Sequence, residues 1–593
     1  MDWLNKYPER FVRECAELDK LSREVDWLTI SWAILPDSLA LEVQIDMVVH
    51  GRVYEARMGY PAIFPNAPLY IRPRDPSERW SNHQFGTGGS LCLQWRADNW
   101  HPEITGADII RSAYELLHTE NTPVEPGVVP SVHALTEGQS SRNIYFRSIV
   151  TKDALSIIEK LEPQSKVELK LNSLFGEGGQ VDFITSFKAA DDSTYVVNDI
   201  PVGITGFSSL FNIDGKGWLL KSDAFDSVDE ISSVEDLLRV IAEAGLDNSD
   251  IAVINETTQK YEKRTIVLYG NKTGQVNQFA IVSYSESPLK QFKVILPPPA
   301  DEMRLPPDHQ NLTGLKVGIV GLGSMGSKIA ISLARSGIRK FVIVDDDFLK
   351  LENLVRHDLS WAEVGLHKVD AIKRALNLIS PNLEIEALNH RVAGQEPPIK
   401  AANALQTLSQ CDLLIDATAN PEVFLHIAAI AHAHKIPMCW GEVYAGGYGG
   451  LIARARPDID PNPIAVRDSF YTYLSELPPA PFKQAHGYDV QADAETPAIA
   501  YDSNVSLIAM SLTSLIIDTL LQVKPSEYPV PVYLIGMKKE WIFTQPFDTR
   551  PIAIQGEGWK DVAEPSSDAS LAAVKLLLDK LSESSSAKPD SNS

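Results

Sequence analysis

Hydrophobic and polar residues alternate between residues 39 and 70, where LALEVQIDMVV and RVYEARMGY place every second side chain on one face. This period of two is typical of antiparallel strands that cover a core on one side. Residues 2–24 and 104–118 instead repeat apolar residues at helical spacing, with Thr105 as a helix cap. Residues 1–142 therefore predict one α+β domain.

The next region, residues 143–296, mixes strand patterns such as TIVLYG with the helical pattern VEDLLRVIAEAG. We predict an α/β linker domain here, and no motif in it points to a particular chemistry. The proline-rich run LPPPADEMRLPPDHQN, residues 296–311, then predicts an extended connection.

A third domain is predicted over residues 297–562. It opens with LKVGIVGLGSMGSKIAISLARSGIRKFVIVDDD, which has the pattern of a buried strand, a glycine turn, a helix and a second strand. CDLLIDATA and KIPMCWGEVYAGGYGG add further strands typical of an α/β sheet. Residues 563–593 predict a short helix and a serine-rich disordered tail. The fold class is thus multidomain, α+β at the N-terminus and α/β in the two later domains, of which the last is Rossmann-like.

The composition fits an ordinary globular protein, with 44% hydrophobic and 22% charged residues in 593. No run approaches the ~20 uninterrupted apolar residues of a membrane span, and the charged N-terminus is unlike a signal peptide, so we expect a cytoplasmic protein without membrane contact. The net charge of -24 disfavours direct nucleic-acid binding. The four scattered cysteines argue against a disulfide framework or a structural zinc site.

Three glycines mark a candidate nucleotide site. Gly321, Gly323 and Gly326 form a G-x-G-x-x-G turn directly after the strand KVGIV and at the start of a helix. Such a turn lets the backbone approach phosphates, and the helix N-terminus offers N–H donors. Taken alone the triplet is weak, since a glycine turn also serves close packing and is typical of dehydrogenases.

Polar residues downstream change this interpretation. The strand after the turn leads into the pattern D-x-D-x5-N-x2-R with a later G-x2-K, filled by Asp345, Asp347, Asn353, Arg356, Gly365 and Lys368. Over about 120 residues the sequence here resembles the adenylation domain of the ubiquitin-activating E1, MoeB and ThiF superfamily.

The resemblance implies that a carboxylate attacks the α-phosphate of ATP, which requires cations on the phosphates and a metal, expected to be Mg²⁺. It assigns Arg356 and Lys368 to the phosphates, Asp347 to the ribose and Asn353 to phosphate orientation. The family often carries a D-x-T-D-N segment with a metal-binding aspartate, where this chain has Asp416-Ala-Thr-Ala-Asn420. Either Asp416 takes over the Mg²⁺, or phosphates and waters hold most of it.

E1 enzymes that pass on their product capture the acyl-adenylate on a cysteine. In fused bacterial relatives this residue lies near a T-P-A-I segment, but here the segment reads QADAETPAIAYDSN and no cysteine follows Cys439. Cys439 and Cys411 occur in apolar surroundings, where a packing role is expected. Either the E1-like half hands its adenylate directly to another thiol, for which Cys92 in GGSLCLQW is the candidate, or this chain has lost that step by nature or by substitution.

The N-terminal domain resembles the ubiquitin-conjugating E2 family, on motifs that occur in the family's order: Tyr60-Pro61-x3-Pro65-x2-Pro68, His83, Gly89-Ser-Leu-Cys92-Leu and Trp100-x-Pro102. The resemblance implies that Cys92 is the thioester nucleophile. The Pro-Asn that follows the family's histidine is replaced by Gln84-Phe85, so the family's oxyanion asparagine is absent, and Asn82 is one substitute. His83 is open to two interpretations, a structural histidine or a base.

The combination resembles the CD-NTase-associated E2–E1 fusions of type II CBASS antiphage operons. It implies ATP-dependent activation of a C-terminal glycine, a thioester on Cys92 and amide formation with a target amine, with the CD-NTase as the conjugated protein and a homodimer formed through the E1-like domain. Two alternatives stay open: a fusion that serves a bacterial ubiquitin-like protein, and a nucleotide-binding scaffold without turnover. The passenger, the acceptor amine and the role of residues 143–296 stay undetermined.

Overall fold

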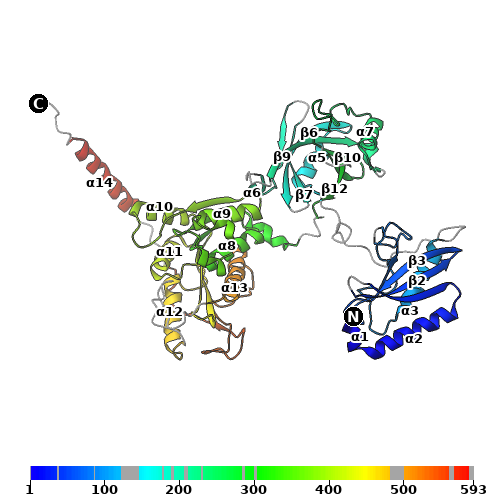
Figure 1. Cartoon of the computed structure of the whole chain (residues 1–593). Helices are drawn as coiled ribbons and strands as arrows, with labels where there is room; N and C mark the ends of the chain where they lie inside the picture. Colours follow the sequence, from blue (N-terminus) through cyan, green and yellow to red (C-terminus); the bar gives the residue numbers. More distant parts are fainter. Residues whose placement is uncertain are drawn as a thin grey trace. The chain divides into compact units, whose positions relative to one another are not determined.

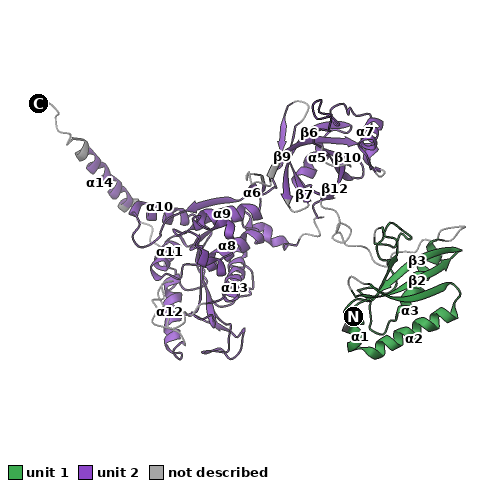
Figure 2. Cartoon of the chain, in the orientation of Figure 1, with its two compact units in different colours: residues 1–142 green, residues 143–593 purple. Residues whose placement is uncertain are grey.

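The computed structural model describes residues 2–35, 39–85, 87–121, 146–176, 179–188, 192–205, 212–228, 231–282, 288–298, 304–480, 500–559 and 567–586. The chain forms two compact units, residues 1–142 and 143–593, shown in green and purple in Figure 2. The helix and strand labels used below are those of Figure 1.

The first unit is an α+β fold. Its antiparallel sheet has the order β1(Leu28–Ile34), β2(Leu41–Val49), β3(Arg52–Gly59), β4(Tyr70–Pro73), and its helices are α1(Asp2–Lys6), α2(Pro8–Glu24) and α3(Gly106–Glu120). The alternation seen in the sequence puts Val43, Ile45 and Met47 into the core, where they cluster with Ile109 and Ala113 of α3. The strands and both helical segments are confirmed, and Asp108 accepts hydrogen bonds from the backbone and hydroxyl of the predicted cap, Thr105.

The next region is built mainly of strands. The sheet order is β5(Phe146–Ile149), β12(Leu289–Ile295), β11(Val276–Ile281), β10(Arg264–Gly270), β9(Asn212–Ser222), β6(Ser165–Gly176), β7(Gly179–Lys188), β8(Thr194–Val196). Because β5 pairs with both β12 and β7, the sheet closes on itself. The helices are α5(Lys152–Lys160), α6(Val202–Thr205), the 3₁₀ turn η1(Asp223–Phe225) and α7(Val234–Glu243), the last of which the sequence predicted. The closed sheet was not foreseen, since strand pairing depends on contacts distant in sequence.

Residues 304–559 form a doubly wound sheet with the order β15(Glu384–Leu388), β14(Lys340–Val344), β13(Lys316–Val320), β16(Leu413–Asp416), β17(Met438–Val443), β18(Gly449–Ala455), β19(Val532–Gly536), β20(Thr549–Ile552). The five strands from β15 to β17 are parallel and the last three are antiparallel. This order reverses direction between β13 and β16, the place where open α/β sheets bind ligands at the carboxyl ends of their strands. The predicted strand, turn and helix around the glycine motif are confirmed.

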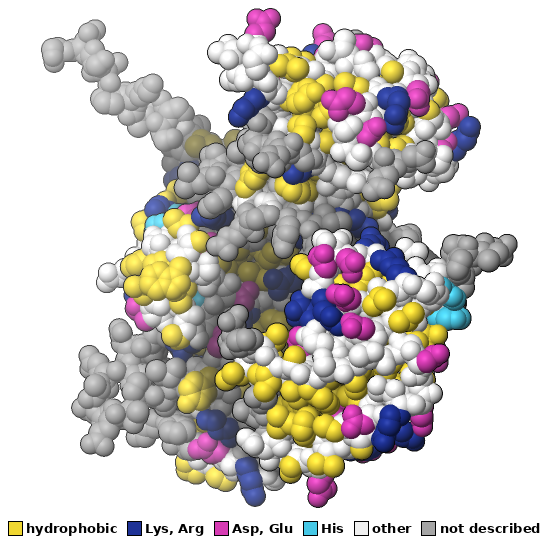
Figure 3. Space-filling model, turned by 45° about the vertical axis from the view of Figure 1, so that its right-hand side comes forward, with side chains coloured by type: hydrophobic (Ala, Val, Ile, Leu, Met, Phe, Trp, Pro, Cys, Tyr) yellow, Lys and Arg dark blue, Asp and Glu magenta, His cyan; other side chains and the backbone are white. Residues whose placement is uncertain are grey.

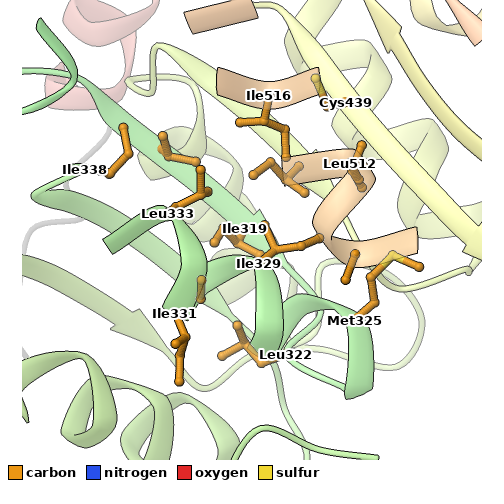
Figure 4. Packing of buried hydrophobic residues seen from close by; sticks show 14 of the residues in the cluster. Ile319, Leu322, Met325, Ile329, Ile331, Leu333, Ile338, Cys439, Leu512 and Ile516 are labelled. Carbon is orange, nitrogen blue, oxygen red and sulfur yellow. The ribbon is translucent and has the colours of Figure 1, made fainter. Parts of the chain in front are cut away.

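Two apolar layers cover this sheet. One contains α8(Ser324–Ser336), α9(Lys368–Ile379) and α13(Asp502–Leu521), with side chains such as Ile329, Leu512 and Ile516 packed on Ile319 (Figure 4). The other contains α10(Pro398–Leu408), α11(Pro421–His434) and α12(Pro463–Ser475). Fully buried strands explain why KVGIV and KFVIV are continuous apolar runs rather than alternating ones.

Helix α13 is long and apolar enough to cross a membrane by length and composition alone. Half of its most apolar 18-residue stretch is buried, however, and Leu512 and Ile516 belong to the core on the sheet, so α13 has the character of a core helix.

On the face shown in Figure 3, acidic and basic side chains are interspersed rather than separated.

The last helix, α14(Ser567–Ser586), confirms the short helix predicted within residues 563–593, and its apolar side chains are exposed. The tail predicted to be disordered begins within this helix, and its end, residues 587–593, lies outside the described residues. Residues 299–303 of the predicted linker also lie outside the described residues. Strand β12 ends before them, and the 3₁₀ turn η3(Pro307–Leu312) follows them.

Candidate adenylation and thiol sites

The glycine turn packs tightly between β13 and the segment after β16. Gly321 has φ +88, and a Cβ there would lie 2.8 Å from Thr418 Cγ2. A Cβ on Gly326, inside α8, would lie 1.8 Å from the carbonyl oxygen of Gly321. Gly323 is the N-cap of α8, so the backbone N–H groups of the first helical turn follow the glycine turn directly. Gly321 and Gly326 thus allow a tight turn that side chains would obstruct.

Asp345, at the end of β14, holds this turn in place. Its Oδ2 accepts a hydrogen bond from the backbone N–H of Leu322 at 2.6 Å, and its Oδ1 accepts one from the backbone N–H of Asp347 at 2.9 Å. Burial raises the pKa of Asp345, against the opposing charge of Lys368. Both carboxylate oxygens are therefore occupied by the backbone, which makes Asp345 a support of the turn in this structure.

Asp347 and Lys368 form an ion pair beside the turn. Lys368 Nζ lies 2.7 Å from Asp347 Oδ2, and the backbone N–H of Lys368 donates to the Asp347 carbonyl at 3.0 Å. Burial acts to raise the pKa of Asp347, but the hydrogen bond and charge of Lys368 outweigh it, so the pKa is lowered. Lys368 is the first residue of α9 and is largely buried, which fixes its ammonium near the strand ends.

Asn353 lies in the 3₁₀ turn η4(Leu351–Val355), and Arg356 is the C-cap of this turn. The side-chain oxygen of Asn353 accepts a hydrogen bond from the backbone N–H of Lys350 at 2.9 Å, and its carbonyl accepts one from the N–H of Arg356 at 3.1 Å. Arg356 is half-buried at the end of this turn. In this structure Asn353 thus shapes the turn that positions Arg356.

His357 is a residue of this site that the sequence analysis did not single out. It is buried, its Nε2 lies 2.8 Å from the Leu322 carbonyl oxygen, and its Nδ1 accepts from the Leu359 N–H. Burial lowers its pKa to about 4, and the charges of Lys368 and Lys328 act in the same direction. A neutral ring with Nε2–H donating to Leu322 therefore ties the glycine turn to the Arg356 loop.

Asp416 ends β16 on the other side of the turn. Its Oδ1 accepts hydrogen bonds from the Thr418 N–H at 2.9 Å and the Thr418 hydroxyl at 2.6 Å. Burial raises its pKa to about 6, against those bonds and the charge of Arg467. Ala419, where the family often has an aspartate, has φ +53, a conformation that alanine rarely adopts and aspartate or asparagine adopt more readily.

A polar group next to Asp416 was also missed by sequence reasoning. Burial raises the pKa of Glu442 on β17 to about 7; the charge of Arg467 on α12 opposes this and Asp416 adds to it. The Arg467 guanidinium carbon lies 4.3 Å from the ring centre of Phe424. The buried hydroxyl of Tyr444 has no hydrogen-bond partner among the described residues. No spacing rule links these positions, because they meet only through the fold.

In the first unit, the half-buried Cys92 lies in a loop between β4 and α3. Its backbone N–H donates to the His83 carbonyl oxygen at 2.6 Å, and its sulfur accepts a hydrogen bond from Arg96 Nη1 at 3.1 Å. His83 therefore holds the backbone of Cys92, while its ring Nε2 lies 3.7 Å from Glu120 Oε1.

Glu120, near the end of α3, fixes the segment before the thiol. Its Oε2 accepts hydrogen bonds from the Ser81 hydroxyl and, at 3.2 Å, from the backbone N–H of Asn82. Gln84 is buried, and its side chain bonds to the Trp80 N–H at 2.7 Å and the Glu78 carbonyl at 3.2 Å. Gln84 is thus engaged in structure at the place where the E2 family continues with Pro-Asn.

The remaining thiols differ from Cys92. Cys411 and Cys439 are buried, and burial raises the pKa of each to about 12. Cys15 is partly buried, and burial and the nearby Asp19 carboxylate raise its pKa. The segment with the T-P-A-I motif lies largely outside the described residues, so the structure gives no geometry for it.

The sequence from residue 302 to residue 480 matches the ThiF family. These residues form a ThiF-family domain, in a chain most of which the family match does not cover. Ubiquitin-like modifier-activating enzyme 5 of Drosophila willistoni is 29% identical over 163 residues, 26% of this chain and 39% of that protein. The ATP-dependent ubiquitin transferase-like protein Cap2 of Enterobacter hormaechei subsp. hoffmannii is 34% identical over 131 residues, 22% of this chain and 21% of that protein.

Among solved structures, a crystal structure of E. coli MccB with ATP aligns with a TM-score of 0.32 and 18% identity, over 42% of this chain and 67% of that chain. The matched segment spans 21% to 39% of the two curated relatives named above. The ThiF-family match begins just before η3 and ends shortly after α12, so it contains every residue of the candidate nucleotide site.

Proposed function

We propose that this chain uses ATP to adenylate the C-terminal carboxylate of a protein, carries the acyl group as a thioester on Cys92 and transfers it to an amine. The observation that supports the first step is the Lys368–Asp347 ion pair. The backbone N–H of Asp347 donates to Asp345, which also accepts from Leu322 in the glycine turn. A nucleotide whose ribose engaged Asp347 would compete for that carboxylate and leave the ammonium for the phosphates. The names of the relatives, a modifier-activating enzyme and an ATP-dependent ubiquitin transferase-like protein, support the same chemistry.

In the adenylation step the substrate carboxylate attacks the α-phosphorus, and pyrophosphate leaves with the electron pair of the broken P–O bond. Negative charge on the transferring phosphate is stabilised by cations that are already in place. Lys368 and Arg356 supply these cations, and the N-terminus of α8 supplies backbone donors. Asp345 and His357 keep the turn fixed while the charge moves.

Mg²⁺ commonly takes one or two protein carboxylates and completes its shell with phosphate oxygens and waters. In the described part of the chain no cluster of three or more His, Cys, Asp or Glu side chains forms a metal site. Asp416 offers a single carboxylate beside the glycine turn, and among the described residues its Oδ1 accepts from Thr418, so the residues fit a magnesium ion held mainly by the nucleotide. The ion would supply charge neutralisation on the phosphates.

The thiol step is assigned to Cys92. Cys411 and Cys439 are buried thiols with raised pKa values, and the thiolate is the reactive form. The loop around Cys92 is instead partly open to solvent and carries a basic side chain at the sulfur. Because both steps belong to one polypeptide, the second gains from a raised effective concentration.

The proposed passenger is a CD-NTase that ends in glycine, within a CBASS-type cytoplasmic defence system, and the proposed assembly is a homodimer through the ThiF-family domain. Exposed apolar side chains around the nucleotide loops support such an interface: Phe348, Leu351, Val355, Trp361 and Leu366. A ubiquitin-like passenger would require the same chemistry, and the name of the Drosophila relative favours this as the second candidate.

Exchange of labelled pyrophosphate into ATP tests the adenylation step. Short synthetic peptides with random sequences and a free C-terminal glycine serve as the acid, and the same peptides with an amidated C-terminus serve as the control. The proposal expects exchange with the free acids only. Binding of ATP without exchange would favour a nucleotide-binding scaffold.

A further inference from the structure

The sulfur of Cys92 has a cationic neighbour that the sequence motifs do not include. Arg96 Nη1 lies 3.1 Å from Cys92 Sγ, within the hydrogen-bond range for sulfur. The partly buried Cys15 differs, because the charges that act on it are the carboxylates of Asp19 and Glu14. Of these two partly buried cysteines, Cys92 thus has a cation at its sulfur, whereas Cys15 lies near carboxylates.

Hydrogen bonds within the loop hold Arg96 in position. Its backbone N–H donates to Asn99 Oδ1 at 2.7 Å, Asn99 Nδ2 donates to the Gln94 carbonyl at 2.7 Å, and the Gln94 N–H donates to the Ser112 hydroxyl of α3 at 2.9 Å. The loop that presents Arg96 is thus anchored to the same helix that carries Glu120.

The guanidinium also keeps unused hydrogen-bonding capacity. Arg96 Nε is buried without a hydrogen-bond partner among the described residues. The carboxylate oxygen Asp98 Oδ1 lies 3.7 Å from this nitrogen, beyond hydrogen-bond distance. A buried donor without an acceptor costs free energy. A negative charge that develops near Cys92 would find donors there already in place.

The residues that follow His83 do not provide such donors. The side chain of Gln84 is engaged by Trp80 and Glu78, and Phe85 is an exposed apolar side chain. The hydrogen bond that a neutral amide would otherwise offer to an oxyanion is therefore missing from both positions. Arg96 approaches the sulfur from the loop on the other side of Cys92 in sequence.

We propose that Arg96 is a catalytic residue of the Cys92 site, which stabilises the thiolate before acyl capture and the oxyanion during both acyl transfers. This proposal rests on the proposed function for the part that concerns transfer. In capture, Cys92 Sγ attacks the carbonyl of the acyl-adenylate, the C–S bond forms, and AMP leaves with the electrons of the C–O bond. In conjugation, an amine forms the C–N bond, its proton passes to solvent, and the C–S electrons return to Sγ beside the guanidinium.

The test is alkylation of Cys92 by iodoacetamide, an uncharged reagent, in the full-length chain, with the rate followed by mass spectrometry of the Cys92 peptide. The rates of the parent, Arg96→Gln and Arg96→Lys are compared at one fixed pH near neutrality, since the thiolate is the form that reacts. Arg111→Gln is the matched control, because Arg111 lies on α3 and pairs with Glu24 and Asp108.

We expect Arg96→Gln to react several-fold more slowly than the parent, because the donor 3.1 Å from Cys92 Sγ that stabilises negative charge on the sulfur is lost. Arg96→Lys, which keeps a cation at this position, should keep most of the rate. Equal rates for Arg96→Gln and the parent, or equal losses in Arg96→Gln and Arg96→Lys, overturn the proposal, since the second result indicates a structural role.

This measurement needs neither ATP nor an acyl substrate. A slower rate for Arg96→Gln together with absent pyrophosphate exchange would therefore reject the proposed adenylation and retain the role of Arg96 at the thiol. An unchanged rate together with active exchange would reject Arg96 alone.

Discussion

The candidate nucleotide site and the candidate thiol site are built from different kinds of backbone. The first lies at the carboxyl ends of β13, β14 and β16, where parallel pairing fixes the register of each strand. The second lies in a loop that is held by side chains distant in sequence, such as Glu120, which bonds to Asn82. The residues of a site on strand ends occur at fixed distances along the chain, so the sequence can predict them. The residues that hold a loop site come from distant segments, so their distance along the chain does not predict the contact.

The largest effect is expected at the strand-end site. Lys368→Ala removes a cation from the phosphates and should lower the rate of pyrophosphate exchange by about 100-fold or more, with the fold retained. Lys373→Ala, on the exposed side of the same helix, is the control and should exchange like the parent. Equal rates for both variants would show that Lys368 does not contact the nucleotide.

At the loop site, the expected effect is on stability. Glu120→Ala leaves the Ser81 hydroxyl and the Asn82 N–H without their carboxylate and should destabilise the first unit by about 1–3 kcal/mol. The measurement is urea unfolding together with hydrogen exchange of the segment from Ser81 to Arg96. Glu115→Ala, an exposed position on α3, should change neither quantity, and equal behaviour of the two variants would contradict the anchoring role of Glu120.

A comparable effect concerns the pH dependence of stability. Burial raises the pKa of Glu442 from 4.5 to about 7, so between these values the folded state binds the proton more tightly than the unfolded state. Stability contributed by protonated Glu442 is therefore lost as the pH rises through this window. Glu442→Gln should melt at a higher temperature than the parent at about pH 8, with the gap narrowing towards pH 5.

The exposed Glu384→Gln on β15 is the control and should show no such pH-dependent gap. A gap of the same size at both pH values would mean that the gain of Glu442→Gln does not come from the buried charge.

The smallest effect is expected at Ala419. Its φ of +53 is unfavourable for a residue with a Cβ, so Ala419→Gly should be close to neutral or stabilising by up to about 1 kcal/mol. Ala417→Gly, two residues earlier, carries no positive φ and should be destabilising. Thermal melting of both variants side by side measures the difference, and a clear loss at Ala419→Gly would contradict the strain.

The first sheet and much of the strand-end site could be predicted from sequence. The alternation of residues before Tyr60 predicted the strands of the first sheet. The glycine turn with Asp347, Arg356 and Lys368 predicted a domain of the kind that the ThiF-family match supports. These features depend on local periodicity and on fixed distances along the chain.

The remainder depends on contacts between distant segments. Arg467 approaches Asp416 and Glu442 only because α12 packs beside the strand ends, and the closure of the middle sheet through β5 and β7 required pairing that periodicity does not encode. Arg96 is close to Cys92 in sequence, but its direction towards the sulfur is set by Asn99 and Ser112. Nothing in the sequence pattern of this loop predicted that Asn99 and Ser112 would orient Arg96.

The most direct test of ATP-dependent adenylation followed by transfer to Cys92 is to locate the acyl group itself. The full-length chain is incubated with ATP, Mg²⁺ and biotinylated peptides that end in a free glycine, and the adduct is mapped by mass spectrometry. We predict an ATP-dependent, dithiothreitol-sensitive adduct on Cys92 that is absent from Cys92→Ser and from Lys368→Ala and present in Cys439→Ser. An adduct on Cys439, or one that forms without ATP, would contradict the account.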